Sequence, residues 1–244
     1  MKKGKIAYRF ETPFYPGNIL YVNLIKNYSC VNNCRFCGRP RNKKEIGKPN
    51  IYEKKANSFL YLSKSPSEKL VIEKIKEEIK KNDKEIAFIG LGEPLIYLDK
   101  VGRIIKKLKK KYPKIKTRID TNGATREINE NPLKVAKKLK VAGLDEIRIS
   151  VNAINEKEYN KLCRPKFKDA FNNLTKFVKK CNKNGINTCV SFILNFRQGG
   201  IKSRPKKDYV KFALSLGIRK KNIILRNYLN VRQPKNENRN CKRI

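Results

Sequence analysis

Three cysteines with a close spacing are the residues of this chain best suited to chemistry. Cys30, Cys34 and Cys37 lie in the run Cys-Val-Asn-Asn-Cys-Arg-Phe-Cys. Thiolates are soft ligands that suit iron–sulfur clusters and zinc. A 4Fe-4S cluster is normally held by four thiolates, so three neighbouring cysteines without a fourth nearby predict a cubane with one iron open to an outside ligand.

Zinc is the main alternative for these thiols. A structural zinc site needs four protein ligands, usually cysteine and histidine in paired spacings. The chain contains no histidine, and its four other cysteines are scattered without a partner spacing: Cys163, Cys181, Cys189 and Cys241. We therefore expect an iron–sulfur cluster with Cys30, Cys34 and Cys37 as its ligands.

The cysteines follow an apolar strand pattern at 19–26, which would deliver them to the end of a sheet. Further strand patterns occur at 85–92, 116–122, 146–152, 187–194 and 222–229. Helices are predicted over 66–81 and 98–111. The first of these starts at Ser65-Pro66-Ser67-Glu68, which combines an N-cap, a proline at the first helical position and a capping-box glutamate. Residues 38–64 resemble a long connection.

A repeated unit fills the rest of the chain: an amphipathic helix, a glycine suited to its left-handed C-terminal position, and an apolar strand. Gly143, Gly185 and Gly217 are these glycines, while Asn131 and Asn155 mark helix starts. Strands separated by helices require right-handed parallel crossovers. Six such units predict an α/β fold, a partial (β/α)6 TIM-like barrel whose active face lies at the strand C-termini.

Polar residues follow the strands on that predicted face. Gly90-Leu91-Gly92-Glu93-Pro94 combines close backbone approach with a carboxylate that suits a ligand ammonium, although such a sequence is also a common turn. Two more strand ends carry side chains that suit ligand binding, namely Asp120 with Asn122 and Ser150 with Asn152. Turn chemistry explains either pair alone, but both on one face favour a ligand site.

Composition limits the class of protein. The 244 residues suit one domain over 1–230 with a basic polar tail at 231–244. No leader pattern opens the chain and no apolar run approaches the roughly 18 residues of a membrane span, so we expect a cytoplasmic protein. Lys and Arg number 60 against 21 Asp and Glu, a net charge of +39. Either a lysine-rich compositional bias or binding to RNA or another acidic partner explains this charge.

The cysteine run resembles the CxxxCxΦC signature of radical S-adenosylmethionine (SAM) enzymes, with Phe36 as the aromatic residue. Gly92-Glu93-Pro94 is similar to the element that holds the methionine amino group in that superfamily, with Leu91 in place of a glycine. The resemblance implies a radical SAM core that binds a 4Fe-4S cluster and SAM. It also implies that Asp120, Asn122, Ser150 and Asn152 contact the cofactor's ribose and carboxylate, or a substrate, while binding of a cation is an alternative for Asp120. Packing on a bound adenine and simple anchoring of the loop are equally good interpretations of Phe36.

Further segments resemble the TatD-associated radical SAM proteins. They are Tyr21-Val-Asn-Leu, Ile149-Ser-Val-Asn-Ala, Tyr159-Asn-Lys-Leu-Cys163-Arg164-Pro165 and Arg226-Asn-Tyr. On this resemblance Cys163 is a candidate hydrogen-atom donor and Arg164 a candidate anion ligand. A capped turn that shapes the loop is an equally good interpretation of both residues.

The resemblance implies reductive cleavage of SAM to a 5′-deoxyadenosyl radical that abstracts hydrogen from a substrate. Three alternatives remain for this chain: an enzyme acting on RNA or another polyanion, an activase or peptide-modifying enzyme, and a non-catalytic iron–sulfur protein that binds nucleic acid. The expected partners are an electron donor such as ferredoxin or flavodoxin and, through the subfamily name, a TatD-like hydrolase.

Overall fold

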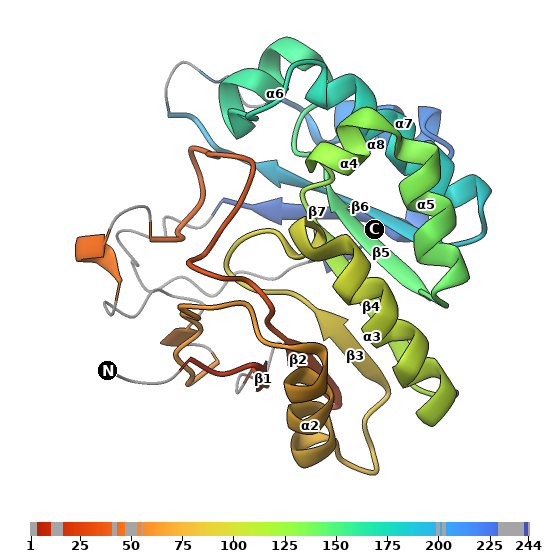
Figure 1. Ribbon diagram of the computed structural model, residues 1–244. Coiled ribbons are helices and arrows are strands. Elements are labelled where there is room, and N and C mark those ends of the chain that lie inside the picture. The colour runs from red at the N-terminus through yellow and green to blue at the C-terminus, as the bar shows by residue number, and fades with distance from the viewer. Residues whose placement is uncertain are drawn as a thin grey trace. The chain divides into compact units, whose positions relative to one another are not determined.

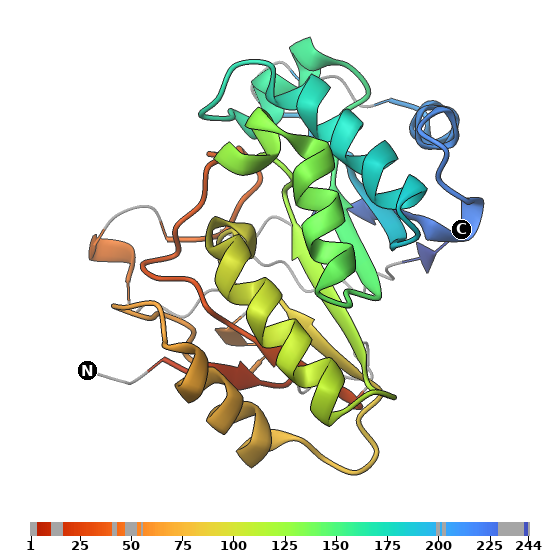
Figure 2. The same ribbon diagram turned by 45° about the vertical axis from the view of Figure 1, so that its right-hand side comes forward.

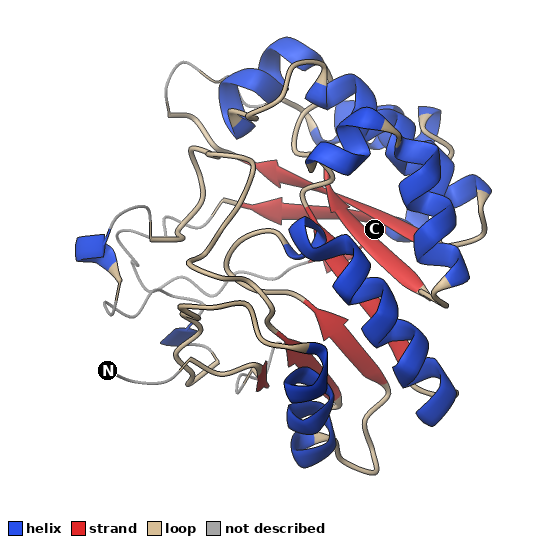
Figure 3. Ribbon diagram, in the orientation of Figure 1, coloured by secondary structure: helices blue, strands red, loops and turns tan. Residues whose placement is uncertain are grey.

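The computed structural model describes residues 4–10, 17–40, 43–46, 53–54, 56–198, 201, 204–228 and 242–243. Its contacts divide the chain into two compact units. Unit 1 comprises Met1–Cys30, Gly38–Asp120 and Ala142–Asp145, and unit 2 comprises Val31–Cys37, Thr121–Val141 and Glu146–Ile244. Each unit combines strands with covering helices (Figure 3).

Unit 1 contains four strands that follow one another in chain order across its sheet. They are β1 (Ala7–Tyr8), β2 (Ile19–Val22), β3 (Glu85–Phe88) and β4 (Lys116–Thr121). β1 is antiparallel to β2, whereas β2, β3 and β4 are parallel, with Leu20 opposite Ile86 and Phe88 opposite Ile119. The helical elements of the unit are η1 (Lys43–Glu45), α2 (Glu68–Glu78), η2 (Pro94–Tyr97) and α3 (Leu98–Lys111) (Figure 1).

Helix α3 shows why unit 1 folds in this way. Its apolar residues recur at helical spacing, so one stripe is buried and the opposite side carries lysine and arginine. The buried stripe consists of Leu98, Val101, Ile104, Ile105 and Leu108. Parallel strands joined by such helices bury the strand side chains that face the helix layer.

Unit 2 repeats the same construction. Its strands are β5 (Glu146–Ser150), β6 (Asn187–Leu194), β7 (Ile223–Asn227) and β8 (Lys242–Arg243). The first three are parallel, and β8 pairs antiparallel with β7. The helical elements are α4 (Arg126–Glu130), α5 (Pro132–Val141), α6 (Glu156–Cys163), α7 (Ala170–Lys183), α8 (Lys206–Ser215) and η3 (Lys220–Asn222).

The predicted elements agree with the structure in number and order for the six main strands. The predicted bounds of α3 and β6 match the structure, while most other strands are shorter than predicted. Gly143, Gly185 and Gly217 have φ of 89°, 72° and 81°, which confirms their left-handed positions. Among the described residues no helix is both long and apolar enough to cross a bilayer.

The predicted start of the first helix was wrong. Ser67, not Ser65, is the N-cap of α2, because its hydroxyl accepts a hydrogen bond of 3.2 Å from the Leu70 amide. Pro66 therefore precedes the helix. The Lys100 ammonium donates hydrogen bonds to Ser65 Oγ and to the Pro66 carbonyl, each at 2.9 Å.

Two short strands were not predicted. β1 and β8 each contain two residues, too few for an alternating pattern to be recognised. Most of the predicted basic tail at 231–244 lies outside the described residues, and β8 is its described part. The single domain over 1–230 stays a prediction.

Candidate active site

In unit 1 the chain enters the cysteine run through a left-handed turn. Asn27 and Tyr28 have φ of 50° and 52°, a conformation that is unfavourable for two consecutive side-chain-bearing residues. The turn is closed by the Ser29 hydroxyl and amide, which donate to the Lys26 carbonyl at 2.6 and 2.9 Å. The Asn27 amide donates to the Leu62 carbonyl at 2.8 Å. These bonds fix the backbone immediately before Cys30.

The Gly92–Glu93 element is fastened to the same turn. The Glu93 amide donates to the Ser29 carbonyl at 2.9 Å. Gly92 has φ of 143°, and a Cβ there would lie 2.4 Å from the Ser29 carbonyl oxygen. Only glycine permits this approach. The Glu93 side chain is fully buried, caps η2 by accepting from the Leu95 amide at 2.9 Å, and is followed by the buried Pro94.

Asp120, at the end of β4, belongs to a chain of buried charges. The Arg118 guanidinium donates to both Asp120 and Glu85, and only 2% of its side chain is exposed. Burial disfavours the charge of Arg118, but the two carboxylates outweigh that effect and raise its pKa. The contact with Arg118 therefore holds the Asp120 carboxyl in a fixed orientation as a hydrogen-bond acceptor.

In unit 2 the segment 31–37 docks on the end of α6. The Asn33 amide donates to the carbonyls of Cys163 and Arg164, each at 3.1 Å, and the Arg35 amide donates to the Leu162 carbonyl at 2.9 Å. Asn32 pairs with Pro165 in an isolated bridge. The last carbonyls of a helix have no partners within the helix. Here they accept hydrogen bonds from the segment that carries Cys34 and Cys37.

This docking explains the Cys163-Arg164-Pro165 motif. Arg164 is the C-cap of α6 with φ of 48°, which turns the chain so that its carbonyls face the docked segment. Its side chain is exposed. Cys163 is fully buried, and its sulfur lies 3.8 Å from Nδ2 of Asn152. The structure thus places the motif as an anchor of the cysteine segment, while hydrogen donation by Cys163 and anion binding by Arg164 stay predictions.

Phe36, between the last two cysteines, belongs to an aromatic row in unit 2. Its ring meets Phe196 edge to face with centroids 6.3 Å apart, and Phe196 meets Tyr228 in the same way at 4.9 Å. Phe36 is only partly exposed. Such a row offers an apolar wall to a flat ligand.

The other predicted polar residues of unit 2 lie at strand ends. Asn122 closes a turn by accepting from the Ala124 amide at 2.9 Å. Ser150 Oγ lies 3.4 Å from Ser191 Oγ on the neighbouring strand β6. Asn152 has a left-handed φ of 63°, and its amide group donates to the Ser150 carbonyl at 3.3 Å. The structure thus brings Ser150, Asn152 and Cys163 together.

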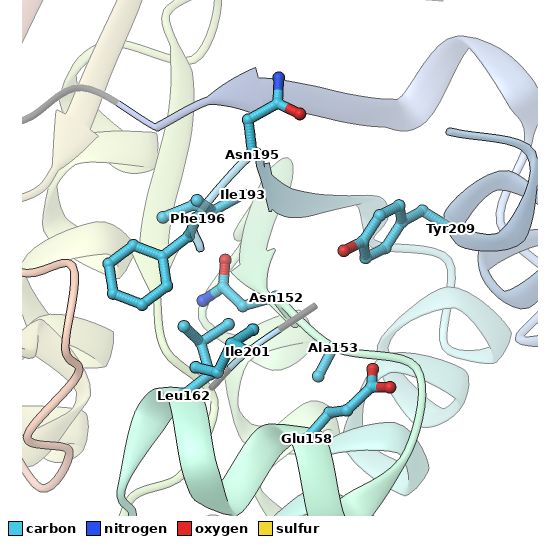
Figure 4. Close-up of a pocket in the computed structure, with 9 residues that line it drawn as sticks. All are labelled: Asn152, Ala153, Glu158, Leu162, Ile193, Asn195, Phe196, Ile201 and Tyr209. Carbon is cyan, nitrogen blue, oxygen red and sulfur yellow. The ribbon is translucent and has the colours of Figure 1, made fainter. Parts of the chain in front are cut away.

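A small hollow lies beside Asn152 (Figure 4). Its apolar lining includes Ile193 and Phe196, and its polar groups include Glu158 and Tyr209. Hydrogen bonds from Arg204 to Glu158, at 2.7 and 2.9 Å, lower the pKa of that carboxyl. Burial raises the pKa of Tyr209, so its phenol stays protonated. The hollow therefore presents both a hydrogen-bond donor and apolar walls.

The family model of the Radical SAM superfamily matches residues 24–199. The chain belongs to the radical SAM superfamily. Solved radical SAM structures have the same fold, and this confirms the predicted α/β partial-barrel class. Coproporphyrinogen III oxidase (HemN) from Escherichia coli superposes with a TM-score of 0.53 and 14% identity, over 86% of this chain and 44% of that one.

The structure of TYW1 with a lysine–pyruvate adduct superposes with a TM-score of 0.57 and 18% identity, over 89% of this chain and 67% of that one. The "Putative glycyl-radical enzyme activating enzyme MJ0021" of Methanocaldococcus jannaschii is 32% identical over 131 residues. That match covers 54% of this chain and 30% of the relative, so the chain spans about a third of that protein's length.

A radical SAM protein uses a 4Fe-4S cluster and SAM, and the donor set of this chain fits both. Cys30, Cys34 and Cys37 are partly exposed thiols, whereas Cys163, Cys181 and Cys189 are buried. Burial raises the pKa of the Cys181 thiol, which makes it a poor thiolate ligand. Across the described part of the chain no three acid, cysteine or histidine side chains are grouped around a single ion position. The ligand assignment therefore depends on spacing and exposure.

Sequence reasoning missed the residues of β6 and α8 that line the hollow. The apolar pattern of 187–194 resembles any buried strand and gives no signal of a site. One signal was available, because Asn195 lies one residue beyond β6 and Asn152 lies two residues beyond β5, and both adopt a left-handed φ. Tyr209 gave no local signal, since it reaches the hollow only through the packing of α8.

Proposed function

We propose that this radical SAM enzyme holds a 4Fe-4S cluster through Cys30, Cys34 and Cys37 and cleaves SAM to abstract hydrogen from a polyanionic substrate. When bound and reduced, the cluster supplies one electron that breaks a carbon–sulfur bond of SAM, giving methionine and a 5′-deoxyadenosyl radical. The protein's own residues bind SAM, orient it and exclude water.

The observation that carries the proposal is the close approach of Gly92 and the hydrogen bond of the Glu93 amide to the Ser29 carbonyl. Ser29 directly precedes Cys30, and the Glu93 amide is bonded to it at 2.9 Å. This contact ties the carboxylate to the backbone that carries the first cysteine. A bound α-amino group is an ammonium that a buried carboxylate stabilises, which supports Glu93 as its ligand.

Residues of unit 2 support binding of the adenosine part. Phe36 and Phe196 offer an aromatic wall on which an adenine ring would pack and from which water is excluded. Ser150 and Asn152 offer a hydroxyl and an amide group, which suit the hydroxyls of a ribose. These roles are part of the proposal.

Anaerobic reconstitution with iron and sulfide, followed by reduction and chromatography for 5′-deoxyadenosine, tests the activity. We expect the wild-type chain to form 5′-deoxyadenosine from SAM and Cys34→Ala to form none. Cys181→Ala is the control, because that thiol is buried in α7 and is not one of the three proposed ligands. If Cys34→Ala showed the same iron–sulfur absorbance per chain as the wild type, the assignment of Cys34 as a ligand would be contradicted.

The charge supports a polyanion as the substrate class. With 60 basic and 21 acidic residues, the protein attracts phosphodiesters at low salt. RNA is the proposed substrate, and stimulation of 5′-deoxyadenosine formation by cellular RNA is the expected result. A product level that RNA leaves unchanged would remove this substrate class and leave the SAM chemistry standing.

A second candidate is the activation of a glycyl-radical enzyme. It is favoured by the 32% identity to the M. jannaschii relative, whose name describes such an activity. An activase would exchange hydrogen with a backbone glycine of a protein, so deuterium from a glycine-labelled target would appear in 5′-deoxyadenosine. Transfer from labelled RNA instead would exclude this candidate.

The electron in either case must come from a reductant. A small acidic redox protein such as ferredoxin or flavodoxin suits the strongly basic chain by charge complementarity. A functional link to a TatD-like hydrolase and a cytoplasmic location belong to the same proposal. Co-purification from the native host would test both partners.

A further inference from the structure

We propose that the outer face of α5 and α7 in unit 2 is the surface on which a nucleic-acid backbone docks. The inference rests on the proposed polyanionic substrate and names the part of the protein that holds it. The two helices pack against each other along their length (Figure 2). Together they carry eight lysines and no aspartate or glutamate.

The burial pattern directs these lysines to solvent. α5 buries Val135, Ala136 and Leu139, and α7 buries Phe171, Leu174, Phe177, Val178 and Cys181. Most of the remaining positions are exposed. Lys134 and Lys137 of α5 and Lys176 and Lys179 of α7 are all exposed. Neighbouring helices lie about 8–10 Å apart, so a single polyanion is long enough to contact lysines of both helices.

Helix-dipole compensation explains only part of this charge. Lys138 and Lys140 lie in the last turn of α5, and Lys180 and Lys183 lie in the last turn of α7, where cations are favourable. Lys134 lies in the first turn of α5, where a cation is unfavourable, and neither helix has an acidic residue in its first turn. Compensation of the helix dipole therefore does not explain a lysine at position 134.

The lysines of α7 also repel one another. Lys176 and Lys180, and Lys179 and Lys183, are each four residues apart. Like charges at this spacing destabilise a helix. A bound polyanion would relieve this repulsion, so the arrangement is favourable in a complex and unfavourable in the isolated chain.

The other helices of unit 2 show that lysine enrichment alone does not produce such a face. In α4, Arg126 pairs with Glu130 at 2.9 Å. Beside α8, Arg204 lies 3.7 Å from Asp208. The first turn of α6 holds Glu156 and Glu158. The chain therefore places acidic residues within or beside these helices but none within α5 or α7, where Asp169 only caps the start of α7.

Titration of a labelled single-stranded RNA with the full-length protein over a range of potassium chloride concentrations tests the inference. The test variant is Lys134→Gln/Lys137→Gln/Lys176→Gln/Lys179→Gln. The matched control neutralises four exposed lysines of α6 and α8: Lys157→Gln/Lys206→Gln/Lys207→Gln/Lys211→Gln. Both variants lower the net charge by the same amount, so they separate a local surface from the overall field.

We expect the test variant to reduce the slope of log K against log salt by about 3, since each lost phosphate contact removes about 0.7 for a single strand. The control should leave the slope close to that of the wild type. The thermal midpoint of the test variant should equal or exceed that of the wild type, because repulsion is relieved.

Equal slopes for the test variant and the wild type, or equal losses in both variants, would overturn the docking face and leave a polyanionic substrate possible. A wild-type protein that does not bind RNA at low salt would overturn both the face and the proposed substrate class. Formation of 5′-deoxyadenosine without RNA is measured separately and reports on the radical SAM activity alone.

Discussion

The phenol of Tyr28 donates a hydrogen bond of 2.9 Å to Oε1 of Glu53. The same carboxylate oxygen accepts from the Leu60 amide at 2.8 Å, and only 3% of Glu53 is exposed. Burial raises the pKa of Tyr28, so the phenol stays a donor. Glu53 therefore braces the left-handed turn that leads to Cys30.

Tyr28→Phe should destabilise the protein by about 1–3 kcal/mol, because a buried carboxylate loses one of its donors. Iron bound per chain after reconstitution should fall as well, since the turn before Cys30 loosens. Tyr61→Phe is the control, because its ring lies against Tyr28 with centroids 5.4 Å apart. Urea unfolding measures the stability, and equal midpoints for the two variants would contradict the bracing role.

Gly92→Ala should cost about 1–3 kcal/mol of folding stability through backbone strain. The added Cβ would lie 2.4 Å from the Ser29 carbonyl oxygen, and the φ of 143° is unfavourable for alanine. Gly102→Ala on α3 is the matched control, because its Cβ would find only Ala142 at 3.8 Å. That change should be neutral or stabilise by about 0.5–1 kcal/mol. The prediction fails if the two variants unfold at the same urea concentration.

Arg164→Gly separates the two roles considered for Arg164. Glycine adopts the left-handed φ of 48° without strain, so the stability of the protein should be unchanged or raised by about 1 kcal/mol. An anion-binding role predicts that 5′-deoxyadenosine still forms in this variant while RNA no longer stimulates it. Retained stimulation by RNA would leave Arg164 only its place as the C-cap of α6.

Acid should destabilise unit 1 through Asp83. Burial opposes ionisation of Asp83, but hydrogen bonds from Arg9 at 2.7 Å and from the Lys80 amide outweigh it and lower its pKa below 3.8. The carboxylate therefore contributes stability above the unfolded-state pKa and loses it as the pH falls through the folded-state pKa. Asp83→Asn should flatten the decline in urea midpoint below about pH 4. An unchanged slope would exclude Asp83 as a source of the acid sensitivity.

Local sequence determined much of this protein. The cysteine spacing and Gly92-Glu93-Pro94 predict the cofactor chemistry, because ligand spacing is a property of a short segment. The apolar periodicity placed α3 and β6 at their observed bounds because each signal lies within the element itself. Gly143, Gly185 and Gly217 follow their helices as predicted, because the left-handed φ at a helix end depends on the residue at that position.

Tertiary packing decided the rest. The docking of 31–37 on the carbonyls of Leu162, Cys163 and Arg164 joins residues more than a hundred positions apart, and a hydrogen bond to a backbone carbonyl leaves no side-chain signature. The hydrogen bond from Tyr28 to Glu53 and the position of Tyr209 in the lining of the hollow beside Asn152 likewise bring distant segments together. Such contacts depend on how helices and strands pack after they have formed. A local sequence pattern determines where a helix or strand lies in the chain more directly than it determines which other element that helix or strand packs against.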